Sequence, residues 1–319
     1  MLKRVDPELV AVLEALPPDL IDLRDIAATR AALARMAADT GRLPPPLDGV
    51  DVEEHAPPPD PVSGLTVKMR LYRPTGRPEA LPALLWMHGG GYVLGDLDQD
   101  DVSLREMVRE IGCAVVSVDY RLAPDHPFPA PLEDCYTALK WVFNAAQRLK
   151  IDPSRIAVGG ASAGGGLAAA LALLARDRAE IGILFQLLIY PMIDDRNVAP
   201  ASATHPDTFI WSRESNRIAW EAYLGREGVS ADNSPYAAVM RASELSRLPA
   251  AYIPVGELDL FLDENLAYAR RLIAAGVPAE LHLYPGAFHG FDGLAPQARI
   301  SRRFIADRDG ALKRALFGS

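Results

Sequence analysis

The residues best suited to chemistry lie around Ser162, in the run Gly160-Ala161-Ser162-Ala163-Gly164. Glycine, alanine or serine stands at every position from 159 to 166, between an apolar stretch at 155–159 and a helix-length stretch at 165–176. A strand, a sharp turn and a helix are the setting of a nucleophile elbow, which needs small residues beside the serine. A phosphate-binding loop is the alternative, but the chain has no GxxxxGK[ST] pattern. The run therefore predicts Ser162 as the nucleophile of an acyl-transfer reaction.

A neutral serine hydroxyl is a weak nucleophile, so Ser162 needs a base. The chain has six histidines, at positions 55, 88, 126, 205, 282 and 289. After a serine elbow the acid comes next along the chain and the histidine last, which leaves His282 and His289. His282 lies within the alternating stretch 279–284, which is typical of a half-exposed strand, whereas His289 lies in the loop after it. The position of His289 favours it as the general base.

The acid that orients the histidine is expected soon after the preceding apolar stretch, at 251–255. Four carboxyl groups follow that stretch, on Glu257, Asp259, Asp263 and Glu264. Asp263 lies where a helix needs a cap, and Glu264 lies in the first turn of that helix. Asp259 lies in the loop between, and Glu257, which is nearer to the strand, is the second candidate.

A second glycine-rich run, His88-Gly89-Gly90-Gly91-Tyr92, follows the apolar stretch 83–87. Consecutive glycines let the backbone approach a ligand, and their N–H groups can stabilise the negative charge of a tetrahedral intermediate. The amide of Ala163, directly after the nucleophile, would be a third donor. A flexible glycine loop is the alternative, but the position upstream of the elbow favours an oxyanion hole. His88 is expected to hold the loop through its side chain.

The elements that must position these residues alternate along the chain. Short apolar runs separated by helix-length stretches predict a mostly parallel sheet covered by helices on both faces. In such sheets ligands bind at the carboxyl ends of the strands. A half-exposed strand is expected at 67–71, where apolar and charged residues alternate. The expected buried strands are 83–87, 114–118, 156–158, 183–189 and 251–255, and the expected helices are 101–111, 131–148, 163–176 and 263–275.

Two segments do not fit this alternation and predict a helical cap. Residues 1–45 and 196–230 are assigned to the cap, and residues 46–195 and 231–319 to the catalytic core. The aromatic side chains of the second cap segment are expected to line an apolar pocket over the sheet, although an ordinary surface insertion is the alternative. The candidate substrate-binding residues are Tyr92, Phe209, Trp211 and Leu260.

Several motifs together resemble the hormone-sensitive-lipase-like (bacterial family IV) carboxylesterases of the α/β-hydrolase fold. The resemblance runs from about residue 65 to residue 291. The segments that carry it are His88–Gly91, Asp119–Ala130, Gly160–Gly164, Ser234–Tyr236, Asp259–Glu264 and His289–Phe291. The chain departs from the family pattern at Ala161, where Asp or Thr is usual, and at Tyr92, where Trp or Phe is usual.

The resemblance implies specific roles for residues of this chain. It implies that Ser162 is the nucleophile, His289 the base and Asp259 the acid. It also implies that the amides of Gly90, Gly91 and Ala163 form the oxyanion hole, with Gly89 supporting the loop. Members carry a helical cap, hydrolyse esters of short to medium acyl chains and need no cofactor, so the expected partner is a small-molecule ester.

Two other functions are compatible with the same residues. An amidase or peptidase would use the same triad, and a non-catalytic small-molecule binder could share the fold. All three triad candidates are present in the expected order, which disfavours the binder.

Composition and charge restrict the partners further. The formal net charge is −9 and no basic cluster stands out, so nucleic acid is not expected. Cys113 and Cys135 show no disulfide or metal-ligand spacing, so no metal site is expected. No signal peptide and no apolar run of membrane-spanning length is visible, which predicts a cytoplasmic protein with no membrane span. A homodimer is compatible with the sequence.

Overall fold

The computed structural model describes residues 2–17, 20–39, 48–59, 64, 66–199, 208–225 and 233–318. Within these residues, eight strands form one sheet in the order β1-β2-β4-β3-β5-β6-β7-β8. Strands β1 and β2 are antiparallel to their neighbours, and the pairs from β4 to β8 are parallel. The strands are β1 (Val50–His55), β2 (Lys68–Pro74), β3 (Leu81–Met87), β4 (Ala114–Asp119), β5 (Ile151–Ala161), β6 (Phe185–Ile189), β7 (Ala250–Gly256) and β8 (Ala279–Tyr284).

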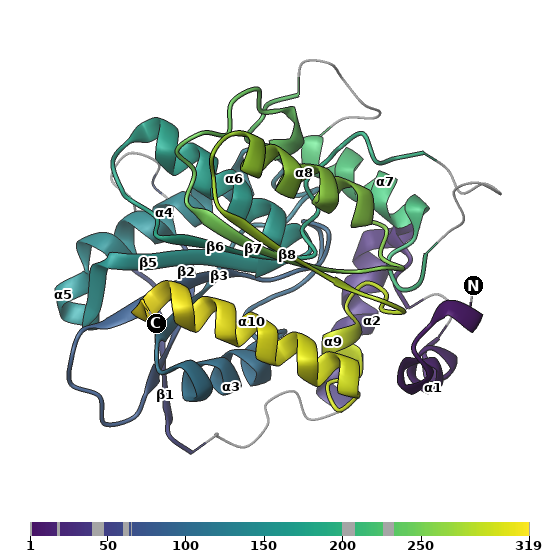
Figure 1. The fold of residues 1–319 in the computed structure, drawn as a ribbon, viewed down its shortest axis with the longest axis horizontal. Coiled ribbons are helices and arrows are strands. Elements are labelled where there is room, and N and C mark those ends of the chain that lie inside the picture. Colours follow the sequence, from purple (N-terminus) through teal and green to yellow (C-terminus); the bar gives the residue numbers. More distant parts are fainter. Residues whose placement is uncertain are drawn as a thin grey trace.

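Helices cover both faces of the sheet (Figure 1). Helices α3 and α10 lie together on one face, and α4, α6 and α8 lie on the other, as the two views agree. The helices of the core are α3 (Asp101–Ile111), α4 (Ala130–Asn144), α5 (Ala146–Leu149), α6 (Ala163–Arg178), η3 (Val239–Arg241), α8 (Leu262–Ala274), α9 (Phe291–Leu294) and α10 (Arg299–Phe317). This architecture confirms the predicted α/β-hydrolase fold.

Strand β3 shows why the sequences of the central strands are unbroken apolar runs. All seven of its residues are buried, because helices cover the sheet on both sides. Successive side chains point to opposite faces. Leu84 and Trp86 therefore join the core under α3 and α10, whereas Leu85 and Met87 join the core under α4 and α6.

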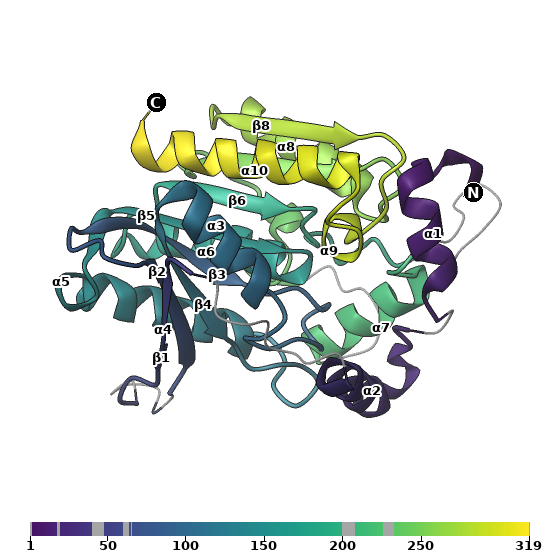
Figure 2. The same cartoon turned by 90° about the horizontal axis from the view of Figure 1, so that it is seen from below.

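The remaining helices lie beyond the carboxyl ends of the parallel strands (Figure 2). They are η1 (Leu2–Arg4), α1 (Pro7–Ala15), η2 (Leu23–Asp25) and α2 (Ile26–Asp39) from the N-terminal segment, and α7 (Arg213–Leu224) from the second segment. The two segments touch, since the Ser215 hydroxyl donates a hydrogen bond to the Ile21 carbonyl at 3.2 Å. Parts of the predicted cap, at 40–45, 200–207 and 226–230, lie outside the described residues, and the division into cap and core stays a prediction.

Three elements differ from the sequence-based expectation. Strand β1 was not predicted, because it is an edge strand in which only Val50 is buried, and its polar residues hide the pattern. Helix α10 was not predicted either, and it begins without a capping side chain. The helix expected at 131–148 is two helices, α4 and α5, which meet at Ala145.

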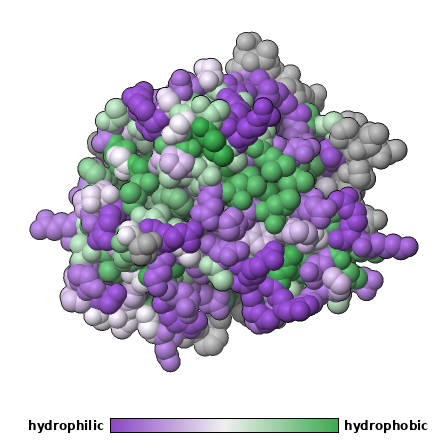
Figure 3. All heavy atoms as spheres, viewed as in Figure 1, coloured by the Kyte–Doolittle hydropathy of each residue, from purple (hydrophilic) through white to green (hydrophobic). Residues whose placement is uncertain are grey.

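On the face shown in Figure 3, apolar side chains gather in patches between polar ones. Large exposed apolar side chains include Leu266 and Ile273 of α8 and Leu283 of β8. In the described part of the chain, no helix is both long and apolar enough to cross a membrane.

Candidate active site

The backbone at Ser162 forms a tight, strained turn between β5 and α6. Its dihedral angles, φ 56° and ψ −120°, are rare for a residue with a side chain. The Ser162 N–H donates to the Ile189 carbonyl at 2.9 Å, and the Ser162 carbonyl accepts from the Met192 N–H at 3.0 Å. Both partners belong to the end of β6 and the loop after it. These bonds hold the hydroxyl at the carboxyl edge of the sheet.

Glycine is required around this turn because backbone passes close on both sides. A Cβ atom on Gly160 or Gly164 would overlap the carbonyl of Met87, at the end of β3. A Cβ on Gly89 would press against the Ala161 carbonyl. The elbow and the glycine run after β3 are therefore packed backbone to backbone.

His289 lies between Ser162 and Asp259 at hydrogen-bonding distance from both. The Nε2 atom of His289 is 3.0 Å from the Ser162 Oγ atom, and its Nδ1 atom is 2.8 Å from Asp259 Oδ2. The three residues come from the loops after β8, β5 and β7, and each is only 5–6% exposed. An imidazole held by a carboxylate on one side and a hydroxyl on the other has the arrangement of a nucleophile, base and orienting acid.

Asp259 is fixed by its own loop, since its Oδ1 atom accepts the Phe261 N–H at 2.9 Å. The other carboxylates considered as acids lie elsewhere. Glu257 pairs with Arg4 at 2.7 Å, and Asp263 is exposed in the first turn of α8. Glu264 is buried, where it accepts the N–H groups of Ile193 and Asp194, and burial raises the pKa of its carboxyl group.

His282, the other candidate base, does not lie in this site. Its Nε2 atom is 2.9 Å from Glu280 on the same strand, and its Nδ1 atom is 3.6 Å from Asp307 of α10. The structure therefore brings together Ser162, His289 and Asp259 and leaves the alternatives outside.

The glycine run after β3 turns sharply beside the elbow. Gly90, Gly91 and Tyr92 have positive φ angles of 117°, 60° and 64°. The turn is closed by the N–H groups of Val93 and Leu94, which donate to the Gly90 carbonyl at 3.0 and 2.8 Å.

The amides proposed for the oxyanion hole are open. Among the described residues, none accepts a hydrogen bond from the N–H groups of Gly90, Gly91 or Ala163. Unused donors beside a serine are what a developing oxyanion requires. The negative end of a substrate dipole would also face the N-terminus of α6, which Ala163 begins.

His88 supports this run from behind. Its Nδ1 atom lies 2.8 Å from the Gly89 carbonyl, and its ring stacks on Tyr120 with the centroids 4.2 Å apart. The Tyr120 hydroxyl donates to the His88 carbonyl at 2.7 Å. Burial lowers the pKa of His88 to about 4, so the ring is neutral near pH 7 and supports the loop as an uncharged group.

Tyr92, one of the predicted substrate-binding residues, is enclosed by packed side chains beside the glycine run. Its ring is 1% exposed and stacks on Tyr223 at 3.9 Å, and its hydroxyl donates to the Met192 carbonyl at 2.8 Å. A ring enclosed in this way supports the glycine run, and the substrate-binding role of Tyr92 stays a prediction. The unusual hydroxyl at this position thus has a structural partner.

The other three predicted pocket residues surround the triad at different depths. Trp211 is buried against Gly91, where a Cβ atom would overlap its ring. Leu260 is also buried, one residue after the acid. Phe209 is half-buried and packs edge-on against Phe288, the residue before the base, with the ring centroids 6.0 Å apart.

Phe209 also lines a cavity of about 760 Å³ between α1 and the segment 208–218. Its lining mixes apolar and polar side chains, and none of the triad candidates is part of it. Its apolar lining residues are Leu2, Leu13, Leu16, Pro17, Leu20, Ile21, Leu23, Phe209, Ile210 and Ile218. In the described part of the chain, no cluster of three His, Cys, Asp or Glu side chains could hold a metal ion.

Two aromatic rings pack against the imidazole of His289; Phe261 was the sequence-based alternative to Leu260 as a pocket residue, and Tyr190 was not suggested by the sequence. Tyr190 and Phe261 contact it edge-on, with centroids 4.8 and 5.1 Å away. The Tyr190 hydroxyl donates to Asp292 at 2.8 Å, which links the residue after β6 to α9, the helix that follows the base. Only the position of Tyr190 at the end of an apolar run could have pointed to the site.

Comparisons with known proteins identify the family and several relatives of the chain. A family model described as alpha/beta hydrolase fold matches residues 84–293. The chain is 38% identical to the esterase LipI of Mycobacterium tuberculosis, over 91% of this chain and 89% of that protein. It is 36% identical to the carboxylesterase NlhH of the same organism, over 98% and 96%. A solved structure titled bacterial heroin esterase superposes with a TM-score of 0.91, at 40% identity and 99% coverage of both chains.

Proposed function

The chain belongs to the alpha/beta hydrolase fold family and is an ester hydrolase, and we propose that it cleaves carboxylic esters of short to medium acyl chains through an acyl-enzyme on Ser162. The observation that carries the proposal is the continuous hydrogen-bonded line from Ser162 through His289 to Asp259.

In the first half of the reaction, Ser162 Oγ attacks the ester carbonyl carbon while His289 Nε2 takes the hydroxyl proton. The electron pair of the carbonyl moves to oxygen, and the Gly90, Gly91 and Ala163 amides receive that oxyanion. Asp259 holds the imidazole so that Nδ1 carries a proton and Nε2 can accept one. The alkoxide then leaves with the proton that His289 returns to it.

In the second half, water takes the place of the alcohol. His289 removes its proton, the acyl carbon accepts the hydroxide, and Ser162 leaves with the proton. No step calls for a cofactor. Phe209 lines a cavity that carries ten apolar residues among polar ones, and its ring packs against Phe288, the residue before His289; this arrangement supports binding of an apolar part of the ester there.

The proposal is tested with a series of p-nitrophenyl esters of increasing acyl length, measured with the wild type and with Ser162→Ala. We expect turnover to be highest for short and medium chains, and Ser162→Ala to lower it by roughly 10⁶-fold. An alanine variant with wild-type activity would contradict the assignment. The p-nitroanilide of the best acyl group decides between ester and amide, and faster cleavage of the anilide would favour an amidase.

The cytoplasmic location and the homodimer expected from the sequence stay predictions.

A further inference from the structure

We propose that Arg30 of α2 is a positioning residue for the oxyanion hole, through which the N-terminal segment holds the glycine run in its active geometry. The inference rests on the proposed function, because it assumes that the Gly90 and Gly91 amides receive an oxyanion.

Arg30 reaches from α2 into the core and makes three directed contacts there. Its Nε atom donates to the Val93 carbonyl at 2.8 Å, and one terminal nitrogen donates to the Ala123 carbonyl at 2.7 Å. The other terminal nitrogen pairs with Asp125 at 2.7 Å. A planar guanidinium with fixed donor directions suits such a three-way contact, which lysine could not reproduce.

The two carbonyls that Arg30 holds belong to one hydrogen-bonded unit with the glycine run. The Val93 N–H closes the turn on Gly90 at 3.0 Å. The Ala123 N–H donates to the Tyr92 carbonyl at 3.0 Å. Arg30 therefore contacts Val93 directly and is linked to Tyr92 through Ala123, and both residues follow immediately after Gly91.

The second segment outside the sheet bears on the same run. Trp211 packs directly on Gly91, and Tyr223 of α7 stacks on Tyr92. The Trp211 ring is itself held by its Nε1 atom, which donates to Asn216 at 3.0 Å. Both segments thus contact residues 91–93. We therefore expect their position to affect the alignment of the amides in the oxyanion hole.

Removing the contacts of Arg30 should misalign the amides without removing them. Small displacements of catalytic groups cost up to about 10²-fold in rate, so we expect Arg30→Met to lower kcat by about 10-fold. KM should stay within about two-fold, because the ground-state ester makes little use of the oxyanion hole. Arg30→Lys should give a smaller loss in the same direction.

Two variants serve as matched controls. Arg35 lies on the same helix, is exposed, and has no hydrogen bond or ion pair with any described residue, so Arg35→Met should keep wild-type kcat. Asp125→Ala removes only the mostly exposed partner of Arg30 and leaves both carbonyl contacts, so it should also keep kcat within about two-fold.

The readout that separates positioning from mere stability is the affinity for a trifluoromethyl ketone with the best acyl group. Ser162 Oγ adds to its carbonyl carbon, His289 takes the hydroxyl proton, and the new oxyanion depends on the same amides. In Arg30→Met we expect this affinity to fall by the same factor as kcat/KM, at a temperature well below the measured melting midpoint. If Arg30→Met does not fold, Arg30→Lys is measured in the same way.

An unchanged kcat, or a loss of kcat with unchanged affinity for the ketone, would overturn the role of Arg30. An equal loss in Arg35→Met would also overturn it. Wild-type enzyme without esterase activity would contradict the proposed function instead, so the two failures are distinguishable.

Discussion

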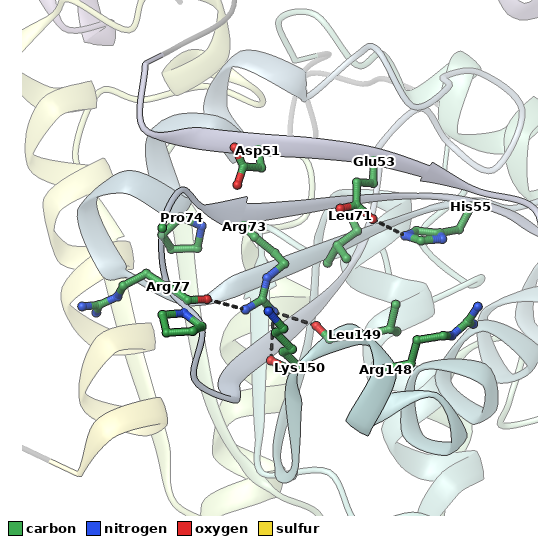
Figure 4. Close-up of a pocket in the computed structure, with 12 residues that line it drawn as sticks. Asp51, Glu53, His55, Leu71, Arg73, Pro74, Arg77, Arg148, Leu149 and Lys150 are labelled. Carbon is green, nitrogen blue, oxygen red and sulfur yellow. Dashed lines mark hydrogen bonds and ion pairs between the residues drawn. The ribbon is translucent and has the colours of Figure 1, made fainter.

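The two ends of the parallel strands carry very different arrangements of charged groups. At the amino-terminal end lies a cavity of about 590 Å³, lined by β1, β2 and the turn after α5 (Figure 4). Its charged and polar lining includes Asp51, Glu53, His55, Arg73, Arg77, Arg148 and Lys150. At the carboxyl end, the candidate site has far fewer ionisable groups, and they are almost fully buried.

The difference lies in what each charged group contacts. At the amino-terminal end, Arg73 donates to the Leu149 and Lys150 carbonyls at 2.7 and 2.9 Å and also reaches the loop at 77–79. It ties loops together and faces no nucleophile. At the carboxyl end, the backbone is strained at Ser162 and donor groups are left unused. Side chains that point at one another and backbone N–H groups without an acceptor therefore mark the candidate site more clearly than the number of charged residues around a cavity.

The largest contrast between neighbouring carboxylates should be that of Asp259 and Asp263. Asp259→Asn removes the charge that holds the His289 tautomer, and by analogy with other serine hydrolases we expect kcat to fall by about 10³–10⁴-fold. Asp263→Asn, at an exposed position four residues on, should change kcat less than two-fold. Steady-state kinetics on one ester compares the two variants. A larger loss of kcat in Asp263→Asn than in Asp259→Asn would assign the role of the acid to Asp263.

A pair of glycines with similar backbone angles tests the two ends directly. Gly91 and Gly76 both have positive φ, 60° and 74°, but a Cβ on Gly91 would overlap Trp211, whereas Gly76 has open space around it. Gly91→Ala should displace an oxyanion amide and lower kcat/KM by about 10²-fold. Gly76→Ala should leave kcat/KM unchanged. Equal losses of kcat/KM in Gly91→Ala and Gly76→Ala would contradict the assignment of the active site to the carboxyl end of the strands alone.

The buried imidazole behind the glycine run makes stability depend on pH. Burial lowers the pKa of His88 to about 4, against 6.5 in an unfolded chain. Between these values the unfolded state binds more protons, so stability is complete above pH 6.5 and falls by roughly 2–3 kcal/mol as the pH drops to 4. Urea unfolding of the wild type and His88→Asn at pH 4.5 and 7 checks this. An identical pH dependence in both proteins would assign it to other groups.

The smallest effect on activity is expected at the amino-terminal cavity. Arg73→Met breaks the contacts to the loop carbonyls and should lower the free energy of unfolding by roughly 1–3 kcal/mol. Ester hydrolysis at a temperature where the variant is folded should stay within two-fold of the wild type. A selective loss of kcat in this variant would show that the two ends are coupled.

The candidate catalytic residues could be predicted better than the contacts that support them. Ser162, Asp259 and His289 could be singled out because strand order fixes their order along the chain and each follows an apolar run, and the structure places them within hydrogen-bonding distance of one another. Arg30 could not be found, because its contacts with Val93 and Ala123 span 63 and 93 residues and leave no local pattern. The contacts of Tyr92 could not be predicted either, since its position beside Gly91 in the sequence does not reveal that its ring stacks on Tyr223.

The secondary structure likewise includes elements that the sequence predicts and elements that it does not. Buried strands such as β3 are visible as apolar runs, because both faces are covered. The edge strand β1 is not visible, because its pairing with β2 depends on backbone hydrogen bonds and its side chains are mostly exposed.

The most direct test of the central claim is covalent capture of the nucleophile. The wild-type protein is treated with a fluorophosphonate, and its intact mass is measured by mass spectrometry. Proteolytic digestion then locates the adduct. We expect one adduct per chain, on the peptide that contains Ser162, and none on Ser162→Ala. An adduct on another residue, or ester hydrolysis that survives with Ser162 unmodified, would contradict the assignment of Ser162 as the nucleophile.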